Sequence, residues 1–130
     1  MVSASRKLDS KGHMMKKVSR YRNVKVTIDG NKFDSKKEGK RYQELKLMAR
    51  AGVITALELQ PKYELVPTLR LITETLCRRS YIADFRYKDN YGDTIVEDVK
   101  SPITKKDPTY RLKRHLFLAK YGDEMTFREI

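Results

Sequence analysis

Cysteine is almost absent from the sequence, and tryptophan is missing altogether. The single cysteine, Cys77, cannot form a disulfide within the chain, so we expect a reducing compartment such as the cytoplasm. With one cysteine and only two histidines, His13 and His115, the chain cannot assemble an ordinary four-ligand zinc site. Zinc is therefore not expected, and any metal ion would have to be bound by oxygen ligands.

Long apolar segments are missing as well. No stretch approaches the ~18 consecutive apolar residues that a membrane-spanning helix requires. The first twenty or so residues also lack the apolar region of a secretory signal. We therefore expect no membrane partner.

Positive charge is what the sequence has in excess. Lysine and arginine number 29 against 17 aspartates and glutamates, which gives a formal net charge of +12 in 130 residues. Such a field attracts phosphate backbones at long range and adds salt-dependent affinity. Nucleic acid is the expected partner, although a basic surface that serves only solubility, or one attracted to an anionic membrane, would carry the same charge.

The length favours one domain with a modest core. Residues 1–20 are basic with few apolar side chains, which predicts a disordered arm. The run from Ser10 to Met15 could also be the remnant of an expression vector. The folded domain is expected over residues 21–130.

Two helices are predicted from apolar residues at helical spacing. The first begins at Ser35, with Glu38 three residues later as in a capping box, and ends at Gly52. The second begins with the cap and first-turn pair Asp107-Pro108 and ends at Gly122. The expected buried residues are Tyr42, Leu45, Met48 and Ala49 in the first helix and Leu112, Leu116 and Ala119 in the second.

Strand-forming residues dominate most of the remaining chain. Turn residues at Asp29-Gly30 and at 90–93 indicate that the strands on either side of them pair as hairpins. The strands are expected at residues 24–28, 32–33, 56–59, 63–66, 69–76, 81–87, 94–99 and 125–130. This order of helix, several strands, helix and strand predicts a mixed α/β, α+β-like fold in which helices flank one small sheet.

Carboxylates interrupt two of the apolar strands. Asp84 lies in one strand, and Glu97 and Asp98 lie in the other. Because side chains alternate along a strand, Asp98 shares a face with Lys100 while Glu97 points to the opposite face. If the two strands form a hairpin, Asp84 can lie close to Asp98.

Two neighbouring carboxylates and a lysine suit the hydrolysis of a phosphodiester. A divalent cation such as Mg²⁺ or Mn²⁺ relieves the repulsion between Asp84 and Asp98 while binding phosphate and water. The ammonium group of Lys100 can orient the attacking water and stabilise the negative charge that builds on the phosphate. The same three side chains could instead form a satisfied ion pair across two strands.

Further candidates lie in the helices and loops. Glu38 falls on the buried face of the first helix, where it could bind the metal or only cap the helix. Gln60 could help to position a water molecule or cap a strand end. The basic residues that could contact phosphates, or simply be solvated, are Lys62, Lys105, Lys106, Arg111 and Arg114.

A family resemblance rests on these residues. Asp84, followed 14 positions later by Asp98-Val99-Lys100, resembles the PD-(D/E)XK signature of the restriction-endonuclease-like superfamily. The chain also resembles small bacteriophage proteins, often known only as a domain of unknown function, from about Tyr21 to Tyr121. The segments that carry this second likeness are residues 33–38, 59–63, 81–85 and 97–100.

The resemblance implies a restriction-endonuclease-like core with a defined site. Asp84, Asp98 and Glu38 would be the metal ligands, and Lys100 would be the catalytic lysine. Phage junction-resolving endonucleases of similar architecture use such a helix glutamate and act as dimers. The implied protein is a homodimeric, Mg²⁺- or Mn²⁺-dependent DNA endonuclease that cuts branched DNA, such as Holliday junctions, in the cytoplasm of a bacterial host.

Two positions depart from the PD-(D/E)XK signature. Ala83 stands where a proline would precede the first acid, and the second acid could be Glu97 or Asp98. The face shared with Lys100 favours Asp98, but a β-bulge would shift the alternation and expose Glu97 instead.

Two other functions fit the same sequence. A non-catalytic, basic nucleic-acid-binding module would bind in a salt-sensitive manner that metal does not affect. An assembly or regulatory protein would require a protein partner and would bind nucleic acid weakly at physiological salt. Convergence of Asp84, Asp98 and Lys100 in three dimensions is what a nuclease domain over residues 21–130 requires.

Overall fold

The computed structural model describes residues 24–130, so the arm predicted for residues 1–20 lies outside the described residues. The chain falls into two units, which divide between Lys36 and Lys37. Within the described range, no helix is both long enough and apolar enough to cross a membrane.

The first unit contains a short antiparallel hairpin. Its strands are β1 (Val26–Ile28) and β2 (Asn31–Phe33), which pair from Val26 with Phe33 to Ile28 with Asn31. Asp29 and Gly30 between them have positive φ angles of 53° and 79°. Two successive positive φ angles are what a tight hairpin turn requires, so the predicted hairpin is confirmed.

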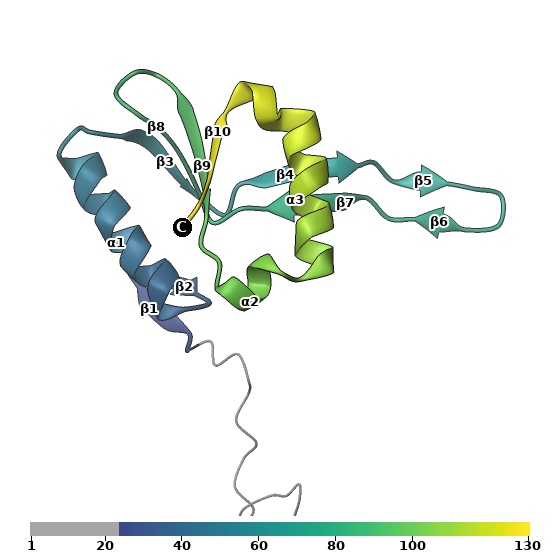
Figure 1. Cartoon of the computed structure of the whole chain (residues 1–130), viewed down its shortest axis with the longest axis horizontal. Helices are drawn as coiled ribbons and strands as arrows, with labels where there is room; N and C mark the ends of the chain where they lie inside the picture. The colour runs from purple at the N-terminus through teal and green to yellow at the C-terminus, as the bar shows by residue number, and fades with distance from the viewer. Residues whose placement is uncertain (1–23) are drawn as a thin grey trace, which may run out of the picture. The chain divides into compact units, whose positions relative to one another are not determined.

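The second unit is built on a four-stranded mixed sheet. The strands are β3 (Thr55–Leu59), β8 (Phe85–Lys88), β9 (Thr94–Asp98) and β10 (Thr126–Glu129). They lie in the order β10, β9, β8, β3, with β10 parallel to β9 and the other neighbours antiparallel (Figure 1). The helix α1 (Lys36–Arg50) precedes this sheet, and α3 (Pro108–Tyr121) connects β9 to β10. The predicted mixed fold of sheet and helices is confirmed.

The two long helices lie on opposite sides of the sheet (Figure 1). Side chains of the buried strand β9 alternate between these faces. Val96 belongs to the same core cluster as Phe117 of α3, whereas Glu97 binds Arg41 of α1. The ring of Phe117 stacks on that of Tyr81 with a centroid distance of 4.6 Å, so aromatic contacts fill the α3 side of the core.

A second ribbon of strands extends from the sheet (Figure 1). It consists of β4 (Lys62–Val66) paired with β7 (Arg79–Ile82), and of β5 (Leu69–Arg70) paired with β6 (Thr75–Leu76). The prediction of one continuous strand at residues 69–76 is therefore wrong. Leu71 donates its main-chain N–H to the carbonyl of Glu74 at 2.7 Å, and this bond closes the turn between β5 and β6.

The prediction of one strand at residues 81–87 is also wrong, because the chain changes sheets in its middle. Residues up to Ile82 pair with β4, and residues from Phe85 pair with β3 and β9. Ala83 donates its main-chain N–H to the carbonyl of Pro61 at 3.1 Å. Proline has no N–H to return, so the ladder is interrupted at this point.

The predicted buried face is confirmed for α1 and is wrong for α3. Tyr42 and Leu45 of α1 are buried, and Met48 and Ala49 are half-buried. On α3 the buried residues are Tyr110 and Phe117. The three residues expected to be buried there are exposed, namely Leu112, Leu116 and Ala119. Aromatic rings remove more apolar area from water than leucine, so the aromatic face of α3 packs inward.

A short helix that the sequence analysis did not predict precedes α3. It is α2 (Pro102–Lys105), and the side chain of Ser101 caps it by accepting the main-chain N–H of Thr104. The predicted start of α3 is confirmed, because Asp107 accepts the main-chain N–H of Tyr110 at 2.9 Å. The predicted closing strand corresponds to β10.

Candidate active site

The structure brings Asp84, Asp98 and Lys100 together. Phe85 of β8 pairs with Glu97 of β9, and Asp84 therefore stands next to Asp98 at the adjoining ends of these strands. The Oδ2 of Asp84 accepts the main-chain N–H of Val99 at 2.7 Å. The Nζ of Lys100 lies 3.2 Å from the Oδ1 of Asp98. This is the convergence that the sequence analysis required of a nuclease, while the catalytic role of the three residues stays a prediction.

Asp84 lies at the point where the chain passes from β7 to β8. Its main-chain N–H donates to the carbonyl of Glu97 at 3.1 Å, and its carbonyl accepts the N–H of Gln60 at 2.9 Å. Gln60 itself has a positive φ of 50° and is exposed. The main chain of Gln60 therefore helps to fix Asp84, whereas the proposed role of the Gln60 side chain stays a prediction.

Asp98 is fully buried, and a tyrosine that the sequence analysis did not single out holds it. The hydroxyl of Tyr81 donates to the Oδ2 of Asp98. The Oδ1 has no hydrogen-bond partner among residues 24–130 and lies in ion-pair contact with Lys100, while the side chain of Asp84 is the other charged neighbour of Asp98. Alternation along the strand places Tyr81 and Ala83 on one face, but nothing in the sequence shows that this face meets Asp98.

Burial raises the pKa of both aspartates. The pKa of Asp84 rises to about 6 from an ordinary value of 3.8, first because of burial and also because of the negative charge of Glu38, while the N–H of Val99 opposes the rise. The pKa of Asp98 rises to about 7, first because of burial and then because of the charge of Asp84. At neutral pH the pair is therefore able to retain a proton, which a cation could displace.

The donor atoms of this site suit a hard divalent cation. Two carboxylates lie side by side, and one buried oxygen, Oδ1 of Asp98, lacks a hydrogen-bond partner in the described part of the chain. Glu38, in the first turn of α1, is buried and contributes to the negative field at Asp84. Residues 24–130 nevertheless contain no preformed group of three or more histidine, cysteine or acidic ligands. Remaining ligands would have to be water and phosphate, as is usual for Mg²⁺.

Glu97 belongs to a different cluster on the other face of β9. Arg41 of α1 donates to both of its carboxylate oxygens, from Nε at 2.7 Å and from a terminal nitrogen at 2.6 Å, and the hydroxyl of Tyr87 donates as well. The pairing of β9 with β8 runs without a bulge from Thr94 to Glu97. The structure thus places Asp98, and not Glu97, beside Lys100.

The partners of Glu97 were not predicted from the sequence. Arg41 is 56 positions away in the chain, and no local pattern links the two residues. Burial, followed by the hydrogen bond to Glu97, raises the pKa of Tyr87 to about 12. The hydrogen bond to Glu97 likewise raises the pKa of Arg41. This cluster therefore has the character of a structural ion pair.

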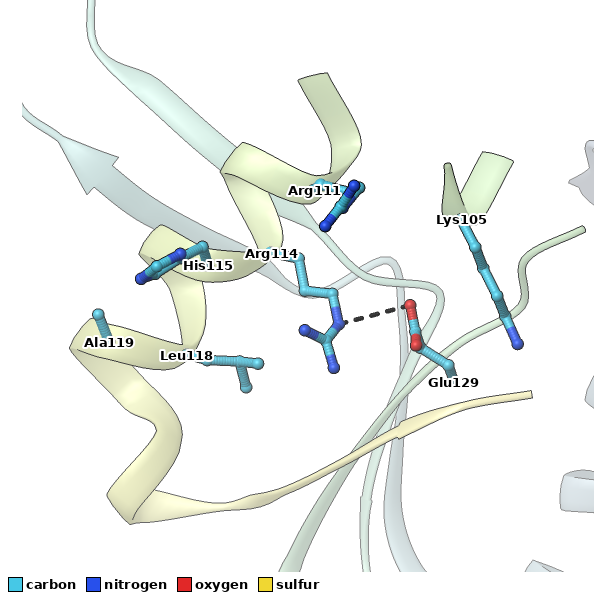
Figure 2. Close-up of a pocket in the computed structure, with 7 residues that line it drawn as sticks. All are labelled: Lys105, Arg111, Arg114, His115, Leu118, Ala119 and Glu129. Carbon is cyan, nitrogen blue, oxygen red and sulfur yellow. Dashed lines mark ion pairs between the residues drawn. The ribbon is translucent and has the colours of Figure 1, made fainter. Parts of the chain in front are cut away.

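Three of the five predicted phosphate-contacting residues line one pocket. Lys105 of α2 and Arg111 and Arg114 of α3 line it together with Glu129 of β10, and Arg114 points towards Glu129 (Figure 2). The other two predicted contacts do not line this pocket: Lys62 is exposed on β4, and Lys106 is the exposed C-cap of α2.

Comparisons with known proteins assign the chain to a family. A search of curated proteins and a search of solved structures each return no match. A family model described as "Protein of unknown function (DUF1064)" matches residues 18–128, which is most of the chain. The chain therefore belongs to the DUF1064 family.

Proposed function

We propose that the protein is a metal-dependent endonuclease that hydrolyses phosphodiester bonds in DNA. The observation that carries this proposal is the convergence of Asp84, Asp98 and Lys100 at the adjoining ends of β8 and β9. A lone ion pair would need only one acid, whereas here two acids lie side by side and both have raised pKa values. Burial is the main cause for both, and the charge of Asp84 raises the pKa of Asp98 further. The net charge of +12 favours a polyanionic substrate.

In this proposal Asp84 and Asp98 bind Mg²⁺ or Mn²⁺, and Glu38 of α1 joins them. When bound, the cation supplies a Lewis acid for the phosphate and for the attacking water. The ammonium group of Lys100, whose side chain is 22% exposed, stabilises the negative charge that develops on the phosphate. Tyr81 orients Asp98 by donating to Oδ2, which directs Oδ1 towards Lys100 and the substrate.

The substrate and the assembly follow from the resemblance. We propose branched DNA, such as a Holliday junction, as the preferred substrate, because the chain resembles phage junction-resolving endonucleases, which use a helix glutamate like Glu38. Two symmetric cuts across a junction require two copies of the site, so the active form would be a homodimer. A single exposed cysteine, Cys77, supports a reducing compartment such as the cytoplasm.

A cleavage assay tests the proposal. Labelled four-way junction, forked, duplex and single-stranded DNA would be incubated with Mg²⁺, with Mn²⁺ or with EDTA. We expect metal-dependent cutting that is fastest on the branched substrates. Asp98→Asn and Lys100→Ala should each lower the rate by about 100-fold or more, since each removes a charge that acts on the transition state.

Matched controls separate the site from the general charge of the protein. Lys88→Ala changes the exposed last residue of β8, and Asp93→Asn changes the exposed residue just before β9, both at the end of the hairpin away from the site. Both variants should cut at close to the wild-type rate. If the protein binds DNA but does not cut it under any metal condition, the nuclease proposal is wrong. A non-catalytic nucleic-acid-binding module would then be favoured.

A further inference from the structure

A basic pocket lies on the side of the molecule that α3 covers, with a volume of about 670 Å³. Its wall is formed by residues of α3 at positions i, i+3, i+4, i+7 and i+8, by α2 and by β10 (Figure 2). These residues are Lys105, Arg111, Arg114, His115, Leu118, Ala119 and Glu129. The volume is within the ~300–1,000 Å³ typical of ligand sites.

The charges of the pocket select an anion. Three of its side chains are cationic, and its one carboxylate is already engaged. Glu129 accepts a hydrogen bond from the hydroxyl of Tyr110, and the same oxygen lies 3.4 Å from the Nε of Arg114. Within residues 24–130, neither Lys105 nor Arg111 has a carboxylate within ion-pair distance. The net field in the pocket is therefore positive.

Arg114 is held in place before any ligand arrives. Its guanidinium carbon lies 5.4 Å from the centroid of the Phe127 ring, in cation–π contact. Its buried Nε lacks a hydrogen bond within the described residues and makes only the long contact to Glu129. A guanidinium fixed in this way presents a planar fork of donors that matches the oxygens of a phosphate group.

The pocket lies beside the candidate active site. Glu129 pairs with Asp98 across the parallel strands β10 and β9, so their main chains are about 4.8 Å apart. Tyr110, which donates to Glu129, also has its ring centroid 5.0 Å from the Nζ of Lys100. A group bound in the pocket would therefore be a close neighbour of a phosphate at Lys100.

We propose that this pocket binds a phosphate of the nucleic-acid strand next to the phosphodiester that is cut. The statement that this phosphate lies next to the bond that is cut rests on the proposed function. The statement that the pocket binds a phosphate does not. The pocket fixes where along the strand the backbone lies, and it thereby sets which phosphodiester reaches Lys100.

The test is DNA binding in EDTA, measured by fluorescence anisotropy on an oligonucleotide without a terminal phosphate. The pocket variant is Lys105→Gln with Arg111→Gln, and the matched control is Arg50→Gln with Lys88→Gln. All four residues are exposed, and both variants lose two positive charges. We expect the pocket variant to bind about tenfold more weakly than the control and to lower the slope of log affinity against log salt by about one to two.

Two further measurements identify which phosphate is bound and control for misfolding of the variant. If the pocket variant binds more weakly than its control only when the oligonucleotide carries a 5′-phosphate, the pocket binds a terminal phosphate. That result would overturn the proposed backbone contact. Arg114→Lys keeps the charge but loses the fork, so it should cost several-fold in affinity with an unchanged thermal midpoint. If the pocket variant and its control bind DNA with equal affinity, the proposal that this pocket binds a phosphate is wrong.

The outcome is independent of catalysis. Because binding is measured in EDTA, a protein that never cuts DNA can still show the pocket effect. A protein that cuts DNA normally, with no pocket effect, would retain the proposed function and lose only this inference.

Discussion

Glu97 and Asp98 are adjacent, fully buried acids in one strand with very different surroundings. Both oxygens of Glu97 are bound by Arg41, and Tyr87 adds a third hydrogen bond. Asp98 has one tyrosine donor, and its second oxygen makes only an ion pair with the partly exposed Lys100. A carboxylate with all its partners supplied by the fold is suited to structure, whereas one with an unsatisfied oxygen is suited to binding a ligand.

Loss of Arg41 should expose this difference. Arg41→Met would leave the charge of Glu97 buried without its partner, which typically costs about 3–5 kcal/mol in the free energy of unfolding. Urea denaturation followed by circular dichroism measures the loss. The control is Arg50→Met on the same helix, which is exposed and should change the value by no more than about 0.5 kcal/mol.

A second change on the Arg41→Met background tests the cause. Glu97→Gln removes the buried charge, so the double variant should be more stable than Arg41→Met alone. If Arg41→Met costs no more than Arg50→Met, the ion pair with Glu97 does not stabilise the fold, and our structural interpretation of Glu97 is wrong.

At the level of elements, the ribbon that ends in β5 and β6 differs from the rest of the sheet. Leu69, Leu71, Ile72 and Leu76 are all exposed there, and among the strands of residues 24–130 β5 and β6 pair only with each other. An isolated two-stranded hairpin is only marginally stable in water. We therefore expect this tip to contribute little to the stability of the folded chain.

Two sets of substitutions test the contrast between the tip and the core. Leu69→Ser with Ile72→Ser should change the free energy of unfolding by less than about 1 kcal/mol, because both side chains are already in water. Phe117→Ala should cost about 3–5 kcal/mol, since Phe117 is fully buried. Urea denaturation at low protein concentration compares them. A loss at the tip as large as that of Phe117→Ala would show that another surface covers these residues.

The same elements show what can be predicted from sequence. The hairpin of β8 and β9 was predictable because its signals are local: a turn at residues 90–93 and two strands of alternating residues. From that hairpin the proximity of Asp84, Asp98 and Lys100 follows directly. The order of helix, several strands, helix and strand was predictable in the same way, whereas the parallel pairing of β10 with β9 was not predicted.

Features that depend on distant partners were not predictable. Residues 69–76 all favour strands, and without glycine or asparagine at residues 71–74 nothing marks the turn there. Helix α3 has two apolar stripes, one through Leu112 and Leu116 and one through Tyr110 and Phe117. Which stripe is buried depends on Tyr63 and Tyr81, which pack against Phe117 from other strands.

For the whole molecule, the paired aspartates link folding to pH. Their pKa values of about 6 and about 7 in the folded state exceed the ordinary value of 3.8. The folded state therefore binds protons more tightly than the unfolded state. The stabilisation from these protons is fully present below about pH 4 and is lost as the pH rises through 6 and 7.

In EDTA the free energy of unfolding should therefore fall between pH 4 and pH 8 by a few kcal/mol more in the wild type than in Asp98→Asn. A difference of one between folded and unfolded pKa values corresponds to about 1.4 kcal/mol. Urea titrations at each pH measure the fall. The exposed Asp93→Asn should follow the wild type, and parallel curves for wild type and Asp98→Asn would contradict the coupled pair.

Addition of Mg²⁺ or Mn²⁺ should restore the free energy of unfolding at high pH and have little effect on it at low pH. A cation that binds only the folded state stabilises it by an amount that grows with the ratio of free cation to the dissociation constant. Protons compete for Asp84 and Asp98, so the affinity for metal rises as the pair loses its proton. The same cation should leave the free energy of unfolding of Asp98→Asn nearly unchanged at pH 8. Equal stabilisation of both proteins would show that the metal binds elsewhere, and it would contradict metal binding by Asp84 and Asp98.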